Sequence, residues 1–236
     1  MESSFDSCCA FTKTEEGGYS GLPQDAGNWT SGRVGSGVLI GSNMGVSAPT
    51  LADWIGREFA LTPAYMKALP TQTYTAIVRA KYWRRMNIGA LPAGLDLSVM
   101  DHGWNRGAST SVRLVQRLVG VPVVDGDCGP ETLAAIAGVT PAALLEHASM
   151  LDVEELQACL SLPKDGDLGP KTSAAFLALP ASQALLYAVA AAQVADYRAV
   201  ARANPGDRQF LNGWLMRAIR RTQQAALLAA QVPVSA

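Results

Sequence analysis

The stretch SFDSCCAFTKTEEGGY, residues 4–19, decides how the chain begins to fold. Its first twelve positions, 4–15, contain neither glycine nor proline, so they predict a short helix. Three residues precede Glu16 at helical spacings and place its carboxyl near their apolar face: Phe5, Cys9 and Thr12. Gly17 and Gly18 then end the helix, as a left-handed cap would.

Glu16 is the first candidate for chemistry. A carboxyl beside a helix C-terminus meets the negative end of the dipole, and partial burial further penalises its charge. Both effects favour the protonated form, which suits a general acid. Helical geometry does not separate Glu16 from Glu15, and a glutamate before two glycines can also be an ordinary C-terminal residue.

Composition describes a globular chain with a real core. It has 236 residues, of which 49% are hydrophobic and 17% charged. A net charge of −1 gives no support to nucleic-acid binding by the whole molecule. The four cysteines, at 8, 9, 128 and 159, lack the paired spacing of a zinc site, so free, buried thiols are expected.

Helical patterns dominate, which predicts a mainly α fold. Residues 50–60, 63–69, 71–86, 182–203 and 207–231 read as helices. Residues 17–47 differ, because they contain nine glycines. They predict a long loop with a small β-hairpin near 34–45, and a long loop in a compact domain is usually functional.

An internal repeat follows. Residues 112–136 read VRLVQRLVGVPVVDGDCGPETLAAI, and residues 153–176 read VEELQACLSLPKDGDLGPKTSAAF. Each copy predicts a helix, an Asp-Gly turn and a second helix begun at Gly-Pro. The pattern resembles peptidoglycan-binding modules. The second copy either binds glycan or is only a packing unit in which Asp165, like Asp125 in the first copy, is a turn residue.

Several segments together resemble the muramidases of glycoside hydrolase family 108. They are EGGY at 16–19, DAGNWT at 25–30, GVSAPTL at 45–51, YW at 82–83, DHGWNRG at 101–107 and FLNGW at 210–214. The likeness covers most of residues 5–136 and part of the C-terminal end. The chain departs from the family at Asn28 and Trp29, where a glycine and its neighbour are usual.

The resemblance implies a lysozyme-like catalytic domain in residues 1–92, with a cleft extending to 110. Residues 93–236 would form a helical peptidoglycan-binding region that contains the duplicated unit. Such an enzyme hydrolyses the β-1,4 bond between N-acetylmuramic acid and N-acetylglucosamine. In this family the glutamate of the first motif is the essential acid, which is Glu16 here.

The remaining catalytic candidates lie in the glycine-rich segment. Asp25 is either a second catalytic carboxylate or a turn-capping residue. Thr30 or Ser47 could position water in its place.

Substrate contacts are expected from aromatic faces that pack on sugar rings, and from polar residues near the cleft. These candidates are Tyr19, Asn28, Trp29, Ser47, Trp54 and Asn105. Asn105 could instead cap a helix.

The same residues exclude other chemistries. The only histidines, His102 and His147, join no Ser/His/Asp or metal-ligand pattern, which argues against an amidase or a zinc peptidase. No cofactor or metal is expected. Peptidoglycan is the expected partner, without nucleic acid, and the chain is expected to act as a monomer.

Localisation is an expectation from the N-terminus, which is acidic and lacks an apolar leader. No membrane span is expected either, because the uncharged residues 172–195 are interrupted by proline and glutamine. The protein would be made in the cytoplasm and reach the cell wall through a holin-type or similar release, as an endolysin does.

Two other functions remain open. One is a non-catalytic wall-binding protein whose altered loop, at Asn28 and Trp29, prevents cleavage. The other is a lytic transglycosylase, which also uses one glutamate but forms an anhydro-muramyl product.

Overall fold

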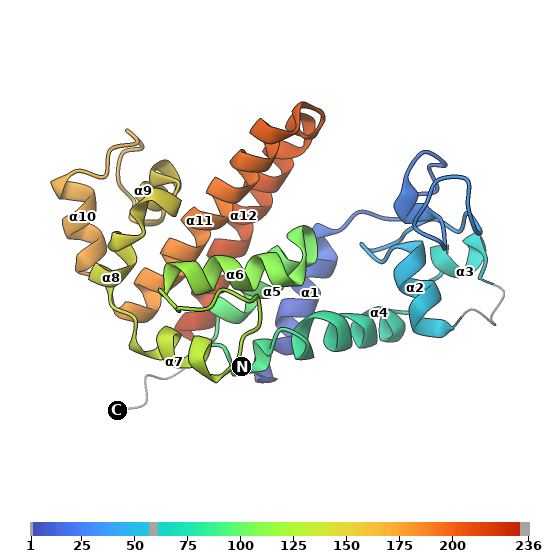
Figure 1. The fold of residues 1–236 in the computed structure, drawn as a ribbon, viewed down its shortest axis with the longest axis horizontal. Helices are drawn as coiled ribbons and strands as arrows, with labels where there is room; N and C mark the ends of the chain where they lie inside the picture. Colours follow the sequence, from blue (N-terminus) through green and yellow to red (C-terminus); the bar gives the residue numbers. More distant parts are fainter. Residues whose placement is uncertain (1, 57–60, 232–236) are drawn as a thin grey trace. The chain divides into compact units, whose positions relative to one another are not determined.

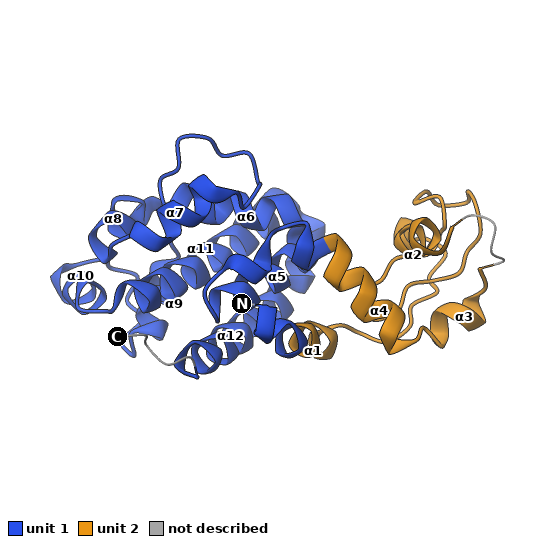
Figure 2. Ribbon diagram, turned by 90° about the horizontal axis from the view of Figure 1, so that it is seen from below, with its two compact units in different colours: residues 1–8, 82–236 blue, residues 9–81 orange. Residues whose placement is uncertain are grey.

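The computed structural model describes residues 2–56 and 61–231. Contacts divide the chain into two compact units, Cys9–Lys81, and Met1–Cys8 together with Tyr82–Ala236 (Figure 2). The boundary between the proposed domains, at residue 92, falls inside the larger unit.

The smaller unit consists of helices and a long looped segment, which lies beside α2 and α3 (Figure 1). Its helices are α1 Phe5–Glu15, which begins in the larger unit, η2 Ala26–Asn28, α2 Ala48–Ile55, α3 Pro63–Lys67 and α4 Thr71–Val78, with the π-helix η3 Arg79–Arg84 at the unit boundary. The helix predicted over 50–60 is α2, and residues 57–60 lie outside the described part. The single helix predicted over 71–86 changes to π geometry at Arg79.

Isolated bridges take the place of a β-hairpin in the segment 17–47. The described residues contain three antiparallel bridges, Ser20↔Ser42, Trp29↔Leu39 and Asn43↔Val46. Glycines with left-handed φ interrupt any longer ladder, at positions 32, 35, 37, 41 and 45. The mainly α fold class is confirmed, with the expected hairpin reduced to these bridges.

Helices are the regular elements of the larger unit in its described residues, and loops connect them. Its elements are η1 Glu2–Ser4, η4 Ile88–Ala90, α5 Leu95–Arg106, α6 Ala108–Leu118, α7 Pro130–Gly138, α8 Pro141–Glu146, η5 Ala148–Met150, α9 Val153–Cys159, α10 Pro170–Leu177, α11 Ala181–Ala203, η6 Pro205–Asp207 and α12 Arg208–Ala230. The long helices α11 and α12 lie side by side, joined by η6, and both pack against α5 (Figure 1). Val194, Tyr197 and Ala218 form their shared core with Trp214 beside them.

The duplicated unit has the predicted helix–turn–helix form twice, as α6 with α7 and as α9 with α10. In the first copy one amide joins the parts: Gln116 Nε2 donates to Asp125 Oδ1, to the Asp127 carbonyl and to Thr132 Oγ1. The Gly126 N–H donates back to Gln116 Oε1 at 2.8 Å.

The second copy repeats these bonds around Gln157. Its Nε2 donates to Asp165 Oδ1, the Asp167 carbonyl and Thr172 Oγ1, and its Oε1 accepts from the Gly166 N–H at 3.0 Å. We call this arrangement the glutamine clasp. Asp125 and Asp165 are therefore turn residues in the structure, whatever else the repeat binds.

Candidate active site

Glu16 lies where the first helix stops. The α-helix ends at Glu15, and the Glu16 N–H reaches back to the Lys13 carbonyl at 3.3 Å. Cys9 and Thr12 on the preceding turns are buried, as the helical spacing predicts, and Glu16 itself is half-buried.

The two glycines after Glu16 do not form the expected left-handed cap. Neither Gly17 nor Gly18 has a positive φ. A Cβ built on either would meet no atom within 4 Å, so the backbone beside Glu16 borders open space. The glycines therefore keep the space beside the helix end unobstructed.

Asp25 and Ser47 both lie near Gly27. Asp25 is exposed and caps η2, its Oδ1 accepting from the Gly27 N–H at 2.8 Å. Ser47 caps α2, and its Oγ lies 2.9 Å from Thr50 Oγ1. A Cβ on Gly27 would lie 3.2 Å from Asp25 Oδ1 and 3.9 Å from Ser47 Cβ, so glycine permits this approach. The turn-capping interpretation of Asp25 matches this geometry.

Trp29 and Thr30 are anchored to other parts of the loop. The Trp29 indole N–H donates to the Pro23 carbonyl at 2.8 Å. Thr30 is bonded to Val38 twice, since Thr30 N donates to the Val38 carbonyl at 3.0 Å and Thr30 Oγ1 accepts from Val38 N at 2.9 Å. Both side chains are half-buried and fixed in place.

Asn28 is fully buried inside the loop. Its Nδ2 donates to the Leu22 carbonyl at 3.1 Å and to Ser20 Oγ at 3.3 Å. Its own carbonyl accepts from Ile40 N and Gly41 N at 3.1 and 3.0 Å. The side chain predicted to touch substrate therefore points into the loop, and Asn28 joins the two sides of the loop through its side chain and its backbone carbonyl together.

Two aromatic side chains offer surface to a ligand. The Lys67 ammonium lies 4.9 Å from the centre of the Tyr19 ring, a cation–π contact. That ring rests against the backbone at Gly41, where a Cβ would come within 2.4 Å of it. Trp54, on α2, is 39% exposed. Their role as sugar platforms stays a prediction.

Asn105 belongs to the larger unit. Its Nδ2 donates to the Tyr197 hydroxyl at 3.2 Å, and the side chain is half-buried near the end of α5. Gly107, not Asn105, precedes α6, so the capping role is not seen.

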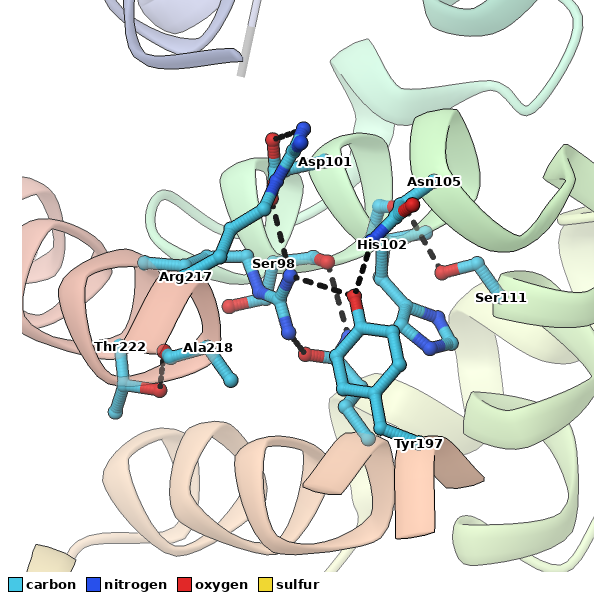
Figure 3. A network of polar contacts seen from close by, with 12 residues as sticks. Ser98, Asp101, His102, Asn105, Ser111, Tyr197, Arg217, Ala218 and Thr222 are labelled. Atoms are coloured by element: carbon cyan, nitrogen blue, oxygen red, sulfur yellow. Dashed lines mark hydrogen bonds and ion pairs between the residues drawn. The ribbon is translucent and has the colours of Figure 1, made fainter. Parts of the chain in front are cut away.

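Sequence reasoning missed a buried charge network that joins α5, α11 and α12 (Figure 3). Arg217 forms a bidentate pair with Asp101 at 2.7 and 3.0 Å. Arg221 donates to Asp101 Oδ2 at 3.0 Å and to Gln193 Oε1 at 2.7 Å. Burial alone would raise the pKa of Asp101, yet the two guanidiniums hold it below its ordinary value. Arginines four residues apart on α12 were the signal available in the sequence.

His102 lies in the same network and is fully buried, with Nε2 3.4 Å from Asp196 Oδ2. Burial lowers the pKa of His102 to about 4, although Asp196 opposes the shift. For Asp196, burial alone would raise the pKa, but hydrogen bonds and charges from His102 and Arg106 lower it to about 2. The imidazole is therefore neutral at pH 7 and packs its ring against Tyr197.

The thiols of the chain agree with the sequence prediction. Its four cysteines are free, with Cys159 half-buried and the others buried, as expected. No three His, Cys, Asp or Glu side chains in ranges 2–56 and 61–231 are grouped to hold a metal. No helix within those ranges has both the length and the apolar character to cross a membrane.

Comparison with known proteins identifies two regions. Residues 9–107 match the model of the glycosyl hydrolase 108 family, and residues 151–219 match that of a predicted peptidoglycan domain. No curated protein sequence matches the chain. The solved structure of SagA from Brucella abortus is 23% identical, covers 97% of both chains and superposes with a TM-score of 0.56, which shows a shared fold. The similarity of residues 9–107 to the glycosyl hydrolase 108 family makes this chain a glycoside hydrolase, and the match of residues 151–219 to a predicted peptidoglycan domain supports peptidoglycan as its polymer.

Proposed function

We propose that the chain is a muramidase that hydrolyses the β-1,4 bond between N-acetylmuramic acid and N-acetylglucosamine, with Glu16 as general acid. The observation that supports this best is the position of Glu16. It is half-buried at the end of α1, and a Cβ on Gly17 or Gly18 would meet no atom within 4 Å, so the backbone beside Glu16 faces open space. In the proposed reaction Glu16 protonates the leaving oxygen while positive charge develops at the anomeric carbon.

We assign the activation of water to the carboxylate of Asp25. Asp25 is exposed, and the Gly27 N–H fixes its Oδ1, so the carboxylate is already oriented. Ser47 is next to it across Gly27, where its hydroxyl can help to place the water. Thr30 is the alternative, because its hydroxyl accepts from Val38 N and still has a proton to donate.

Some of the predicted substrate residues are proposed to touch the sugars directly, and others to hold those residues in place. Tyr19, Trp29 and Trp54 provide aromatic faces for sugars. Asn28, being buried, acts by holding the loop that carries two of these rings. Asn105 stays a prediction for a substrate contact.

Product analysis tests the proposal. Purified peptidoglycan is digested, and the soluble fragments are labelled at reducing ends and weighed by mass spectrometry. A muramidase releases fragments that end in reducing N-acetylmuramic acid. Anhydro-muramyl products, lighter by one water, would identify a lytic transglycosylase instead. Binding to the polymer without any fragments would identify a non-catalytic wall protein.

The physiological role we propose is lysis of a host cell by a monomeric phage endolysin. Peptidoglycan lies outside the cytoplasmic membrane, so an enzyme made in the cytoplasm must be released to reach it. Expression together with a pore-forming holin should lyse the cells, whereas expression alone should leave them intact. Lysis without a holin would contradict this role but not the muramidase activity.

A further inference from the structure

Glu155 lies at a helix position where a glutamate usually accepts a hydrogen bond from the N-cap residue, but in this helix another group accepts that bond. It is the third residue of α9, where a glutamate typically accepts the N–H of the N-cap residue. Here the N-cap is Asp152, and its N–H donates to the Ala191 carbonyl at 3.1 Å. Asp152 Oδ1 in turn accepts from Glu155 N. The helix end is therefore satisfied without the Glu155 carboxyl.

The Glu155 carboxyl also lacks a partner elsewhere. The residue is only 8% exposed, and among the described residues none donates a hydrogen bond to it or forms an ion pair with it. The nearby Arg198 pairs with Asp152 at 3.0 Å and with Glu154 at 3.3 Å instead. Burial raises the pKa of Glu155, partly opposed by the Lys164 charge. Because the Glu155 side chain lines a pocket, its carboxylate can be reached by a cation from outside the chain.

A cavity of about 180 Å³ lies at this carboxyl, between α9 and α12. Its lining consists of Glu155, Ala158, Cys159, Lys164, Ile219, Thr222 and Gln223. Thr222 Oγ1 donates its proton to the Ala218 carbonyl, so towards the cavity it can only accept. Lys164 is exposed and contributes an ammonium. The cavity is smaller than the ~300 Å³ of drug-sized sites, which fits the end of one amino-acid side chain.

The first copy of the repeat shows that these charges are not needed for the fold. The glutamine clasps align Gln157 with Gln116 and Asp165 with Asp125. In that alignment Leu114 stands at the position of Glu155, and Val124 at that of Lys164. Leu114 is buried, so an apolar side chain satisfies the same packing. The acid and the base are thus specific to the second copy.

We propose that this cavity binds the end of a peptidoglycan stem peptide that carries both an amine and a carboxylate, as a diamino acid does. The ligand ammonium pairs with Glu155 and donates to Thr222, while the ligand carboxylate pairs with Lys164. The proposal rests on the proposed function in one respect, that the polymer bound is peptidoglycan.

Calorimetric titration of the full chain with a free stem tripeptide ending in diaminopimelic acid tests the site. The tripeptide has no glycosidic bond, so binding is measured without cleavage. Glu155→Leu and Lys164→Val introduce the residues of the first copy, and each should weaken binding at least tenfold. The control is Glu154→Gln, which changes an exposed carboxylate on the same helix and should leave binding unchanged.

The ligand supplies a second comparison that needs no variant. Acetylation of the side-chain amine should abolish binding to the unaltered protein. A tripeptide ending in lysine, which has the amine without the second carboxylate, should be sensitive to Glu155→Leu and insensitive to Lys164→Val. Equal binding of the acetylated and free tripeptides, or full affinity in Glu155→Leu, would overturn the proposal.

The experiments distinguish a failure of this binding site from a failure of the proposed catalytic activity. Tripeptide binding that depends on Glu155 supports the site even if the protein releases no fragments from peptidoglycan. Conversely, a protein that cleaves peptidoglycan but shows no tripeptide binding retains its proposed activity and loses this site.

Discussion

The amide of Asn28 shows how much one side chain determines in the glycine-rich loop. It joins the segment at Ser20 and Leu22, while the backbone carbonyl of the same residue joins the segment at Ile40 and Gly41. A loop with so many glycines loses much conformational entropy on folding. The amide therefore holds in place the surface on which Tyr19 and Trp29 are displayed.

Asn28→Asp tests this role. The substitution keeps the shape but replaces the donor Nδ2 with an oxygen that faces the Leu22 carbonyl, originally 3.1 Å away. A buried acceptor without a donor should lower the free energy of unfolding by about 1–3 kcal/mol. Urea denaturation measures the loss. Ser20→Ala, which removes only the longer bond at 3.3 Å, should have a smaller effect. Equal stability of Asn28→Asp and the parent would refute the assignment.

His102 makes stability depend on pH in a defined window. Its pKa is about 4 in the folded protein and about 6.5 in an unfolded chain, so the unfolded state binds the proton more tightly. Stability should be fully present above pH ~6.5 and fall towards pH ~4, by an amount on the order of 3 kcal/mol. Asp196 also contributes to stability, because its pKa falls from 3.8 to about 2 on folding. That contribution is lost only as the pH falls below ~3.8.

The His102→Gln variant isolates that contribution. It should be less stable at pH 7 but have a flatter profile of unfolding free energy between pH 6.5 and 4. Titration of Glu155 occurs in both proteins and cancels in the difference. Parallel profiles for the variant and the parent would show that His102 does not titrate as its burial implies.

At the scale of elements, the glutamine clasp explains why two different helix pairs share one turn. Each turn has a left-handed glycine, Gly126 or Gly166, whose N–H donates to the clasp glutamine. If an apolar side chain replaced the glutamine, the glycine N–H would lose its acceptor. The clasp thus links the first helix of each pair to the turn and to the start of the second helix.

Gln157→Leu should release the second clasp alone. Amide exchange at Gly166 should accelerate at least tenfold, because the Oε1 acceptor 3.0 Å away is lost. The free energy of unfolding should drop by about 1–3 kcal/mol. The Gly126 amide, which bonds to Gln116, is the internal control and should exchange at its original rate. Unchanged exchange at Gly166 would contradict the clasp.

The sequence predicted elements better than contacts between them. The helix over 4–15 and the two helix–turn–helix copies follow from periodicity and from turn residues, which are local signals. The hairpin near 34–45 failed to extend because left-handed glycines break the ladder. The network around Asp101 could not be predicted, since its arginines lie 116 and 120 residues further along the chain. The burial of Asn28 was not foreseen for a different reason: its partners are near in the chain, but they lie in an irregular loop that has no periodic pattern.

On the scale of the whole molecule, the chain combines a region that matches a glycoside hydrolase family with a region that matches a predicted peptidoglycan domain. Its larger unit contains both copies of the repeat and the buried Asp101 network, which joins α12 to α5. Removing one partner of such a buried pair is expected to be strongly unfavourable, so this unit should unfold as one cooperative body. The proposed acid, Glu16, belongs to the smaller unit.

The most direct test of the central claim compares Glu16→Gln with Glu15→Gln in the release of reducing ends from peptidoglycan. The two substitutions are chemically identical and adjacent, and only Glu16 follows the end of α1. A general acid contributes roughly 10²- to 10⁴-fold to the rate, so Glu16→Gln should lose activity to that extent while Glu15→Gln keeps most of it. Substantial activity in Glu16→Gln, or an equal loss in Glu15→Gln, would contradict the assignment of Glu16 as the catalytic acid.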